Sequence, residues 1–141
     1  MKRYYLIILV AIVGIIATIF IAHGISLIGP GRLYGHTVSS LENYRISLKL
    51  YHDDSGTYPT NLEQLNPKYR VYAWAPNIAY PTGWFSYDTH PMGTQIKYVS
   101  EFQPDDTGGF LYDNNPQSKD FGKIIINCTH VGYKGIPCSE M

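Results

Sequence analysis

Hydrophobic residues are distributed in two different ways along the chain, and the first pattern is a continuous run. Residues 4–22 are almost entirely apolar, and no charged residue lies between Arg3 and Arg32. As an α-helix these 19 residues extend about 28 Å, close to the thickness of the hydrocarbon core of a bilayer. The run predicts a transmembrane helix within residues 1–23, and its anchoring side chains include Tyr4, Leu6, Ile12, Ile16, Ile19 and Ala22.

Two other interpretations of this run stay open. Ala22 and Gly24 place small residues where a signal peptide is cleaved, although the run is longer than the usual apolar region of about 7–15 residues. A buried helix of a soluble protein is the other alternative, and it needs a larger core than this chain builds. Lys2 and Arg3 favour a cytoplasmic N-terminus, which leaves the rest of the chain outside the cytoplasm.

The second pattern is periodic and occupies residues 24–55. Gly-Pro-Gly at 29–31 predicts a break in the helix, because proline removes a backbone donor and glycine adds backbone freedom. Beyond this break the apolar residues recur every three or four positions, which predicts a linker followed by an amphipathic helix. The stripe is formed by Val38, Leu41, Tyr44, Leu48 and Tyr51.

A sharp corner is predicted directly after the amphipathic helix. Gly56 is a typical helix stop, and Pro59 disfavours helical backbone at Tyr58. Thr60 and Glu63 have the spacing of a capping box, which predicts a second, short helix. We expect Tyr58 to pack the corner back onto the first helix.

The remaining residues, 56–141, predict a turn-rich head that contains strands. Residues 94–102 alternate partly as a strand does, and residues 108–113 and 122–128 flank a polar loop as in a hairpin. A few strands cannot bury a face alone, so the amphipathic helix is expected to cover them. The predicted fold class is α+β, with the long helix packed on a small antiparallel β-sheet.

Charge and motifs exclude several classes of function. The chain has 11 basic and 11 acidic residues, a balance that argues against nucleic-acid binding. The five histidines show no H-x-x-x-H spacing, and phosphate-binding and nucleophile motifs are missing from the sequence. We therefore expect a protein that is not an enzyme.

The two cysteines, Cys128 and Cys138, lie ten positions apart near the end of the sequence. Outside the cytoplasm such a pair predicts a disulfide, and two free thiols are the alternative. A metal site is not expected here, because two cysteines with only His130 between them do not provide four ligands.

The order of these parts resembles the type IV pilins, and most of all the pseudopilins of type II secretion. The end of the pilin helix is similar to the stretch that contains Tyr51, Gly56, Tyr58, Pro59 and Thr60. A second stretch resembles the hairpin of many pilin-like heads, through Gly108, Gly109, Phe110, Tyr112, Gly122 and Asn127. A cysteine pair near the C-terminus is also common in pilins. One departure is that the apolar run lacks the glutamate that pilins carry near the position of Leu6.

This resemblance implies a subunit anchored in the inner membrane, with a periplasmic or extracellular head. It would act by assembly in a type IV pilus or a type II secretion filament, and its partners would be other pilin-like subunits or assembly proteins. Major pseudopilins bind calcium in a C-terminal loop, and Asp113, Asn115 and Asp120 offer oxygen ligands of the kind that calcium prefers. No other cofactor is expected.

Aromatic residues crowd one segment of the head and support an alternative function. Aromatic side chains fill small cores, but they are also enriched at interfaces. The alternative is an anchored or secreted periplasmic binding module whose aromatic loop recognises a ligand. The residues in question are Tyr72, Trp74, Tyr80, Trp84, Phe85 and Tyr87.

Overall fold

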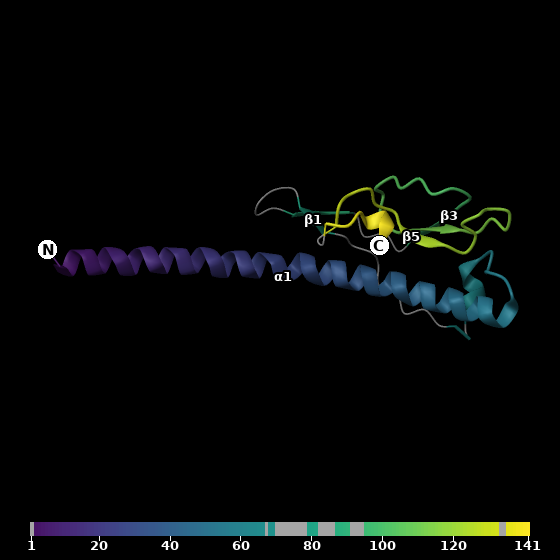
Figure 1. Ribbon diagram of the computed structural model, residues 1–141, viewed down its shortest axis with the longest axis horizontal. Helices are drawn as coiled ribbons and strands as arrows, with labels where there is room; N and C mark the ends of the chain where they lie inside the picture. The colour runs from purple at the N-terminus through teal and green to yellow at the C-terminus, as the bar shows by residue number, and fades with distance from the viewer. Residues whose placement is uncertain (1, 67, 70–78, 82–86, 91–94, 133–134) are drawn as a thin grey trace.

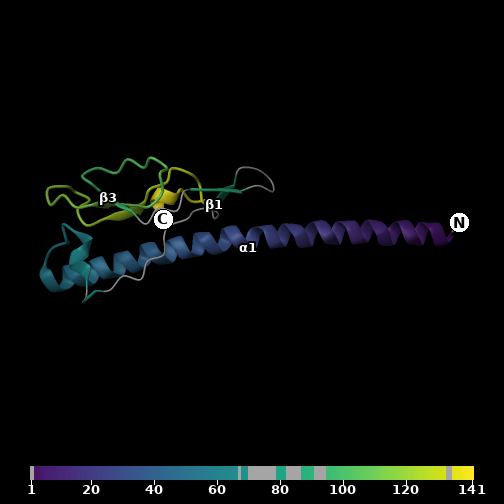
Figure 2. The same ribbon diagram turned by 180° about the vertical axis from the view of Figure 1, so that it is seen from behind.

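One long helix dominates the structure, a computed structural model. It describes residues 2–66, 68–69, 79–81, 87–90, 95–132 and 135–141, with the backbone alone at residues 2, 6, 23, 25–32, 79–81 and 87–88. Helix α1 (Lys2–Ser55) has 54 residues and is about 81 Å long. Its N-terminal part projects beyond the head, which lies along its C-terminal half (Figures 1 and 2).

The predicted helix break at residues 29–31 is wrong, because α1 passes through Gly-Pro-Gly without interruption. A proline inside a helix removes one hydrogen bond, at a cost of about 3 kcal/mol. Here long helical segments lie on both sides, and each adds one hydrogen bond per residue. Residues 24–55 are therefore a continuation of the same helix rather than a linker and a second helix.

The predicted stop after α1 is confirmed. The helix ends at Ser55, and Gly56 adopts φ 76° while its N–H donates to the His52 carbonyl at 2.8 Å. A short 3₁₀ helix, η1 (Leu62–Leu65), follows the corner. It is capped by Asn61, whose side chain accepts from the Glu63 N–H, rather than by the predicted Thr60.

The head contains two small sheets. Strands β1 (Ala79–Pro81) and β2 (Tyr87–Thr89) form an antiparallel pair. The second sheet has the order β3 (Ile96–Val99), β4 (Phe110–Asp113) and β5 (Ile124–Ile126), and η2 (Cys138–Glu140) follows it. The predicted β4–β5 hairpin is confirmed, but β3 pairs with β4 in parallel, so the sheet is mixed rather than antiparallel.

Because β3 and β4 are parallel, residues 100–109 must carry the chain from the end of β3 back to the end of the sheet at which both strands begin. A buried side chain, Asn127, fixes this crossover. Its Nδ2 donates to Asp105 Oδ1 at 2.6 Å, to Thr107 Oγ1 at 3.0 Å and to the Gly108 carbonyl at 3.1 Å. The Asp105 N–H donates back to Asn127 Oδ1 at 2.8 Å.

The core lies between α1 and the three-stranded sheet, which confirms the α+β fold class. From α1, Leu41 and Leu48 are buried, while Tyr44 and Tyr51 pack against the edge of the core. Ile46 and Leu50 lie outside the stripe and are each 50% exposed. The other buried members of the core are Leu62, Leu65, Phe110, Tyr112, Ile124, Ile126, Cys128 and Cys138.

Candidate functional site

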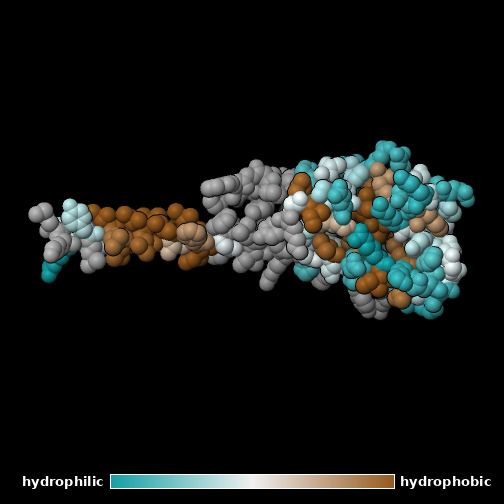
Figure 3. Space-filling view, viewed as in Figure 1, coloured by the Kyte–Doolittle hydropathy of each residue, from teal (hydrophilic) through white to brown (hydrophobic). Residues whose placement is uncertain are grey.

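The first functional feature is the apolar surface of the projecting part of α1. Arg3–Ala22 forms a 20-residue segment with mean hydropathy 3.0, none of it buried against the rest of the chain. Figure 3 shows this hydrophobic surface in brown. By length and composition, this is one helix able to cross a membrane.

The predicted anchor residues all lie on this helix. Tyr4 is 73% exposed, and Ile12, Ile16 and Ile19 are 48–55% exposed. Ala22 is also exposed, and the side chain of Leu6 lies outside the described part of the structure. The exposed apolar side chains surround the helix rather than forming one stripe, as expected where the surrounding medium is itself apolar.

The second feature is the corner at Gly56, Tyr58 and Pro59. The Tyr58 ring lies 4.5 Å from the His52 ring of α1, measured between centroids. It also stands directly against Gly122, where a Cβ would lie 2.1 Å from Tyr58 Cγ. The corner is thus held between the end of α1 and the turn that precedes β5.

A buried hydrogen bond fastens this corner to the sheet. Pro59 is buried, and its carbonyl accepts from the Tyr112 hydroxyl at 2.6 Å. Burial is the main cause that raises the pKa of Tyr112. The hydroxyl therefore stays protonated and remains a donor well into the alkaline range.

The predicted disulfide is not present, because Cys128 and Cys138 are both free and buried. The Cys128 sulfur instead lies 3.0 Å from His90 Nε2. A hydrogen bond from Cys138 is the main cause that lowers the pKa of Cys128 to about 6, and the same bond raises the pKa of Cys138. The lowered pKa favours the thiolate, the form that acts as a metal ligand or nucleophile.

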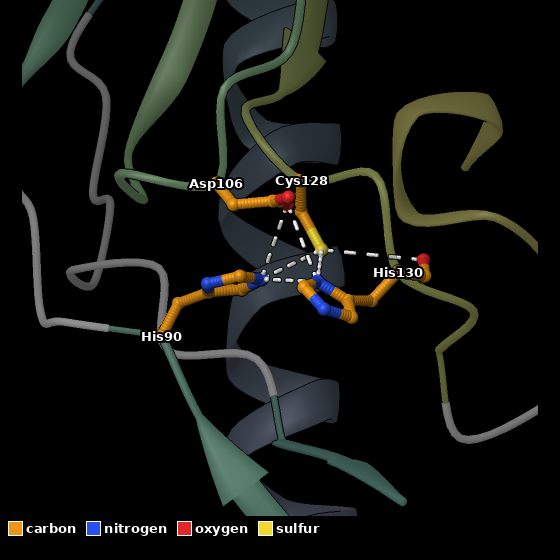
Figure 4. A group of neighbouring side chains, drawn as sticks. All are labelled: His90, Asp106, Cys128 and His130. Carbon is orange, nitrogen blue, oxygen red and sulfur yellow. Dashed lines mark hydrogen bonds and ion pairs between the residues drawn. The ribbon is translucent and has the colours of Figure 1, made fainter.

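The third feature is a cluster of four side chains from three separate segments (Figure 4). His90 follows β2, Asp106 lies in the β3–β4 crossover, and Cys128 and His130 follow β5. His90 and Cys128 are buried, whereas Asp106 and His130 are half-buried. We refer to these four residues as the His-Cys-Asp cluster.

The ligand atoms of the cluster face one another. His130 Nδ1 lies 3.1 Å from His90 Nε2 and 3.9 Å from Cys128 Sγ. Asp106 Oδ1 lies 3.6 Å from His90 Nε2 and 3.3 Å from His130 Nδ1. All four ligand atoms lie within 4.8 Å of one another.

Neighbouring residues orient Asp106 toward the two histidines. Its backbone has φ 60°, a left-handed conformation that aspartate tolerates better than most residues. The Thr129 hydroxyl donates to Asp106 Oδ2 at 2.6 Å, and the Thr129 N–H donates to Oδ1 at 2.6 Å. Although burial opposes ionisation, these hydrogen bonds lower the pKa of Asp106, so the carboxylate is charged at neutral pH.

Two imidazoles, a thiolate and a carboxylate form a donor set suited to a transition metal. The sequence does not predict this set, because its ligands do not lie at the short, regular spacings typical of metal motifs. Cys128 and His130 were visible as a pair, but His90 is 38 positions from Cys128. Asp106 lies near the other three ligands because β3 and β4 pair in parallel, which places the crossover beside the segment after β5.

Two side-chain oxygens of the predicted calcium loop already accept backbone hydrogen bonds. Asp113 Oδ1 accepts from the Asn115 N–H, and Asn115 Oδ1 accepts from the Gln117 N–H, each at 3.0 Å. Asp120 Oδ1 lies 3.6 Å from Lys123 Nζ. Asp113 Oδ2 is buried and has no hydrogen-bond partner among the described residues. Calcium binding stays a prediction.

The predicted aromatic binding loop lies outside the described residues. Tyr80 and Tyr87 are described by their backbone alone, in β1 and β2, and the other four aromatic residues fall in the ranges that the structure omits.

Comparison with known proteins does not assign the chain to a family. No protein-family model, no curated protein and no solved structure matches it.

Proposed function

We propose that this protein is a non-enzymatic, membrane-anchored subunit that acts by assembly with pilin-like partners. The observation that carries this proposal is that the two halves of the continuous helix α1 have different surroundings. Arg3–Ala22 is apolar and is not buried against the described rest of the chain, whereas the C-terminal half of the same helix supports the head. A surface of this kind requires an apolar covering, either lipid or other apolar helices.

One continuous apolar helix can be covered either by lipid or by other apolar helices. Twenty residues extend about 30 Å, enough to cross a hydrocarbon core with every backbone group satisfied inside the helix. The same surface suits packing against identical helices in a filament. In this proposal the protein lies in the inner membrane with a cytoplasmic N-terminus, and the head is periplasmic or extracellular.

The layout supports a pilin-like rather than an unrelated anchored protein. The elements follow one another in the order expected of a pilin: a long helix, a corner at Tyr58 and Pro59, and a β4–β5 hairpin. The parallel β3–β4 pair departs from the antiparallel head that the resemblance implies. We therefore propose a divergent subunit with its own head topology.

Contacts between heads would involve the uncovered side of α1. Ile46 and Leu50 are half exposed, and their spacing of four residues places them together on one face of the helix. They lie beyond the membrane segment, so lipid does not cover them. A neighbouring subunit is the covering that this proposal assigns to them.

A pair of matched arginine variants tests both halves of the proposal. Ile16 and Ile46 are 49% and 50% exposed on the same helix. Ile16→Arg places a charge inside the membrane segment, at a cost of about 2.5–3.5 kcal/mol, and should reduce retention in carbonate-washed membranes. Ile46→Arg should leave retention unchanged and reduce cross-linking between subunits in intact membranes.

Each outcome bears on a different half of the proposal. If Ile16→Arg stays in the membrane fraction as firmly as the unmodified chain, the anchor is wrong. If the unmodified chain is retained but never cross-links to a second copy or to a related subunit, assembly is wrong. An anchored binding module would then be favoured.

A further inference from the structure

The His-Cys-Asp cluster has the dimensions of a tetrahedral metal site. With metal–ligand bonds of about 2.1 Å, neighbouring ligand atoms in a tetrahedron lie about 3.4 Å apart. The five distances between ligand atoms given above range from 3.0 Å to 3.9 Å. The sixth pair, Asp106 and Cys128, lies within 4.8 Å, so a small closing of the cluster would bring all four donors within bonding distance of one ion.

We infer that His90, Asp106, Cys128 and His130 together bind one Zn²⁺ ion as a structural metal site. Four protein donors complete the tetrahedral shell of zinc and leave no position for a substrate, as in structural rather than catalytic zinc sites. The site is distinct from the calcium loop, whose candidate ligands are oxygens alone.

The donor types select zinc from the other common ions. Calcium and magnesium prefer six or more oxygen ligands, and the cluster offers one carboxylate. Blue-copper sites also use two histidines and a cysteine, but in a trigonal arrangement with a long axial ligand that is usually methionine. Here the fourth donor is the Asp106 carboxylate, which lies 3.6 Å and 3.3 Å from the two imidazoles, compared with 3.1 Å between the imidazoles themselves.

The surrounding hydrogen bonds hold the donors in place, as in established metal sites. Thr129 fixes the Asp106 carboxylate through two hydrogen bonds of 2.6 Å. Asn127 fixes the crossover on both sides of Asp106, through Asp105 and Thr107. The segment that carries Cys128, through its neighbours Asn127 and Thr129, thus also positions Asp106.

The ion would join two separate parts of the head. His90 directly follows the β1–β2 pair, and a two-stranded sheet is only marginally stable by itself. The other three ligands belong to the crossover and to the segment after β5. Zinc would therefore attach the two-stranded sheet to the three-stranded one, which is the role metal sites often have in small domains.

The test uses the full chain in detergent, demetallated and kept reduced with a phosphine rather than a thiol. Zn²⁺ is titrated against a chromophoric chelator, and Co²⁺ is used as a spectroscopic probe. We expect one ion per chain, and Co²⁺ spectra with thiolate charge-transfer and tetrahedral bands. Cys128→Ser and His90→Ala should each weaken binding at least about 100-fold.

Control variants separate ligation from general damage to the head. His36→Ala removes an exposed histidine on α1 and should bind one ion as before. Thr129→Val, which lacks the hydroxyl that holds Asp106, should weaken binding about 10-fold to 100-fold. Circular dichroism confirms that each variant is folded, and zinc should raise Tm only in the variants that bind it.

Three results would overturn the inference. The first is a folded, reduced chain that takes up no zinc or cobalt. The second is stoichiometric binding that survives in both Cys128→Ser and His90→Ala. The third is a cobalt complex without the thiolate band. If the cysteine variant fails to fold, Asp106→Asn retains the shape of the side chain and should still weaken binding, and unchanged affinity in that variant also contradicts the site.

Discussion

Replacing Gly122 with alanine tests the contact between the corner and the turn before β5. The new Cβ would lie 2.1 Å from Tyr58 Cγ, and 2.3 Å and 2.5 Å from the two Cδ atoms of the same ring. Gly122 has φ 86°, where alanine costs about 1–2 kcal/mol. Displacing a packed ring adds about 1–3 kcal/mol. The free energy of unfolding should therefore fall by about 2–5 kcal/mol.

A second glycine separates the two contributions. Gly56 also has positive φ, 76°, but an added Cβ there meets nothing within 4 Å. Gly56→Ala should thus lose only the backbone contribution of about 1–2 kcal/mol. Combining Gly122→Ala with Tyr58→Ala removes the obstructing ring, so the double variant should be more stable than the sum of the two single effects predicts.

The assay is urea unfolding of the full chain in detergent, followed by the near-ultraviolet circular dichroism of the tyrosine-rich head. The midpoint and slope together give the change in unfolding free energy. Equal destabilisation by Gly122→Ala and Gly56→Ala would refute the reasoning, because it would mean that Tyr58 does not stand against Gly122 in solution.

The other predictions concern Tyr112 and the cysteines. Tyr112→Phe removes the donor to the Pro59 carbonyl and should cost about 1–2 kcal/mol in the same assay; no loss would contradict that bond. Because the pKa of Tyr112 is raised in the fold, the unfolded chain releases this proton first, and stability should decline as pH rises above about 10. Tyr112→Phe should make this alkaline decline shallower, and an unchanged profile would contradict the assignment. Denatured without reductant, the chain should accept alkyl groups at both Cys128 and Cys138; a gain of about two mass units on reduction would instead reveal a disulfide.

Local signals were sufficient for the parts of the fold that depend on neighbouring residues. The stripe through Leu41 and Leu48, the stop at Gly56 and the β4–β5 hairpin all follow from periodicity or turn chemistry. The predicted break at residues 29–31 is wrong because the two helical segments on either side outweigh the local penalty of proline. Helix propensity is a weak guide where tertiary or membrane context supports the backbone.

The His-Cys-Asp cluster depends on pairings that local signals do not carry. Antiparallel pairing of β3 and β4 was assumed, but the parallel register places the crossover beside the segment after β5. Only then does Asp106 lie near His130. The disulfide prediction failed for a related reason, since sequence separation gives the loop length but not the direction in which the Cys128 sulfur points.

The position of the core has a consequence for how the protein is made. Leu41 and Leu48 are synthesised early, yet they share their core with Ile124 and Ile126 near the other end of the sequence. At a translation rate of about 5–20 residues per second, some 80 further residues take roughly 4–16 seconds to follow. During that interval the amphipathic half of α1 has no sheet to cover it. The head therefore closes only after β5 has been synthesised, and the nascent helix is the stage at which a chaperone or the membrane surface would bind.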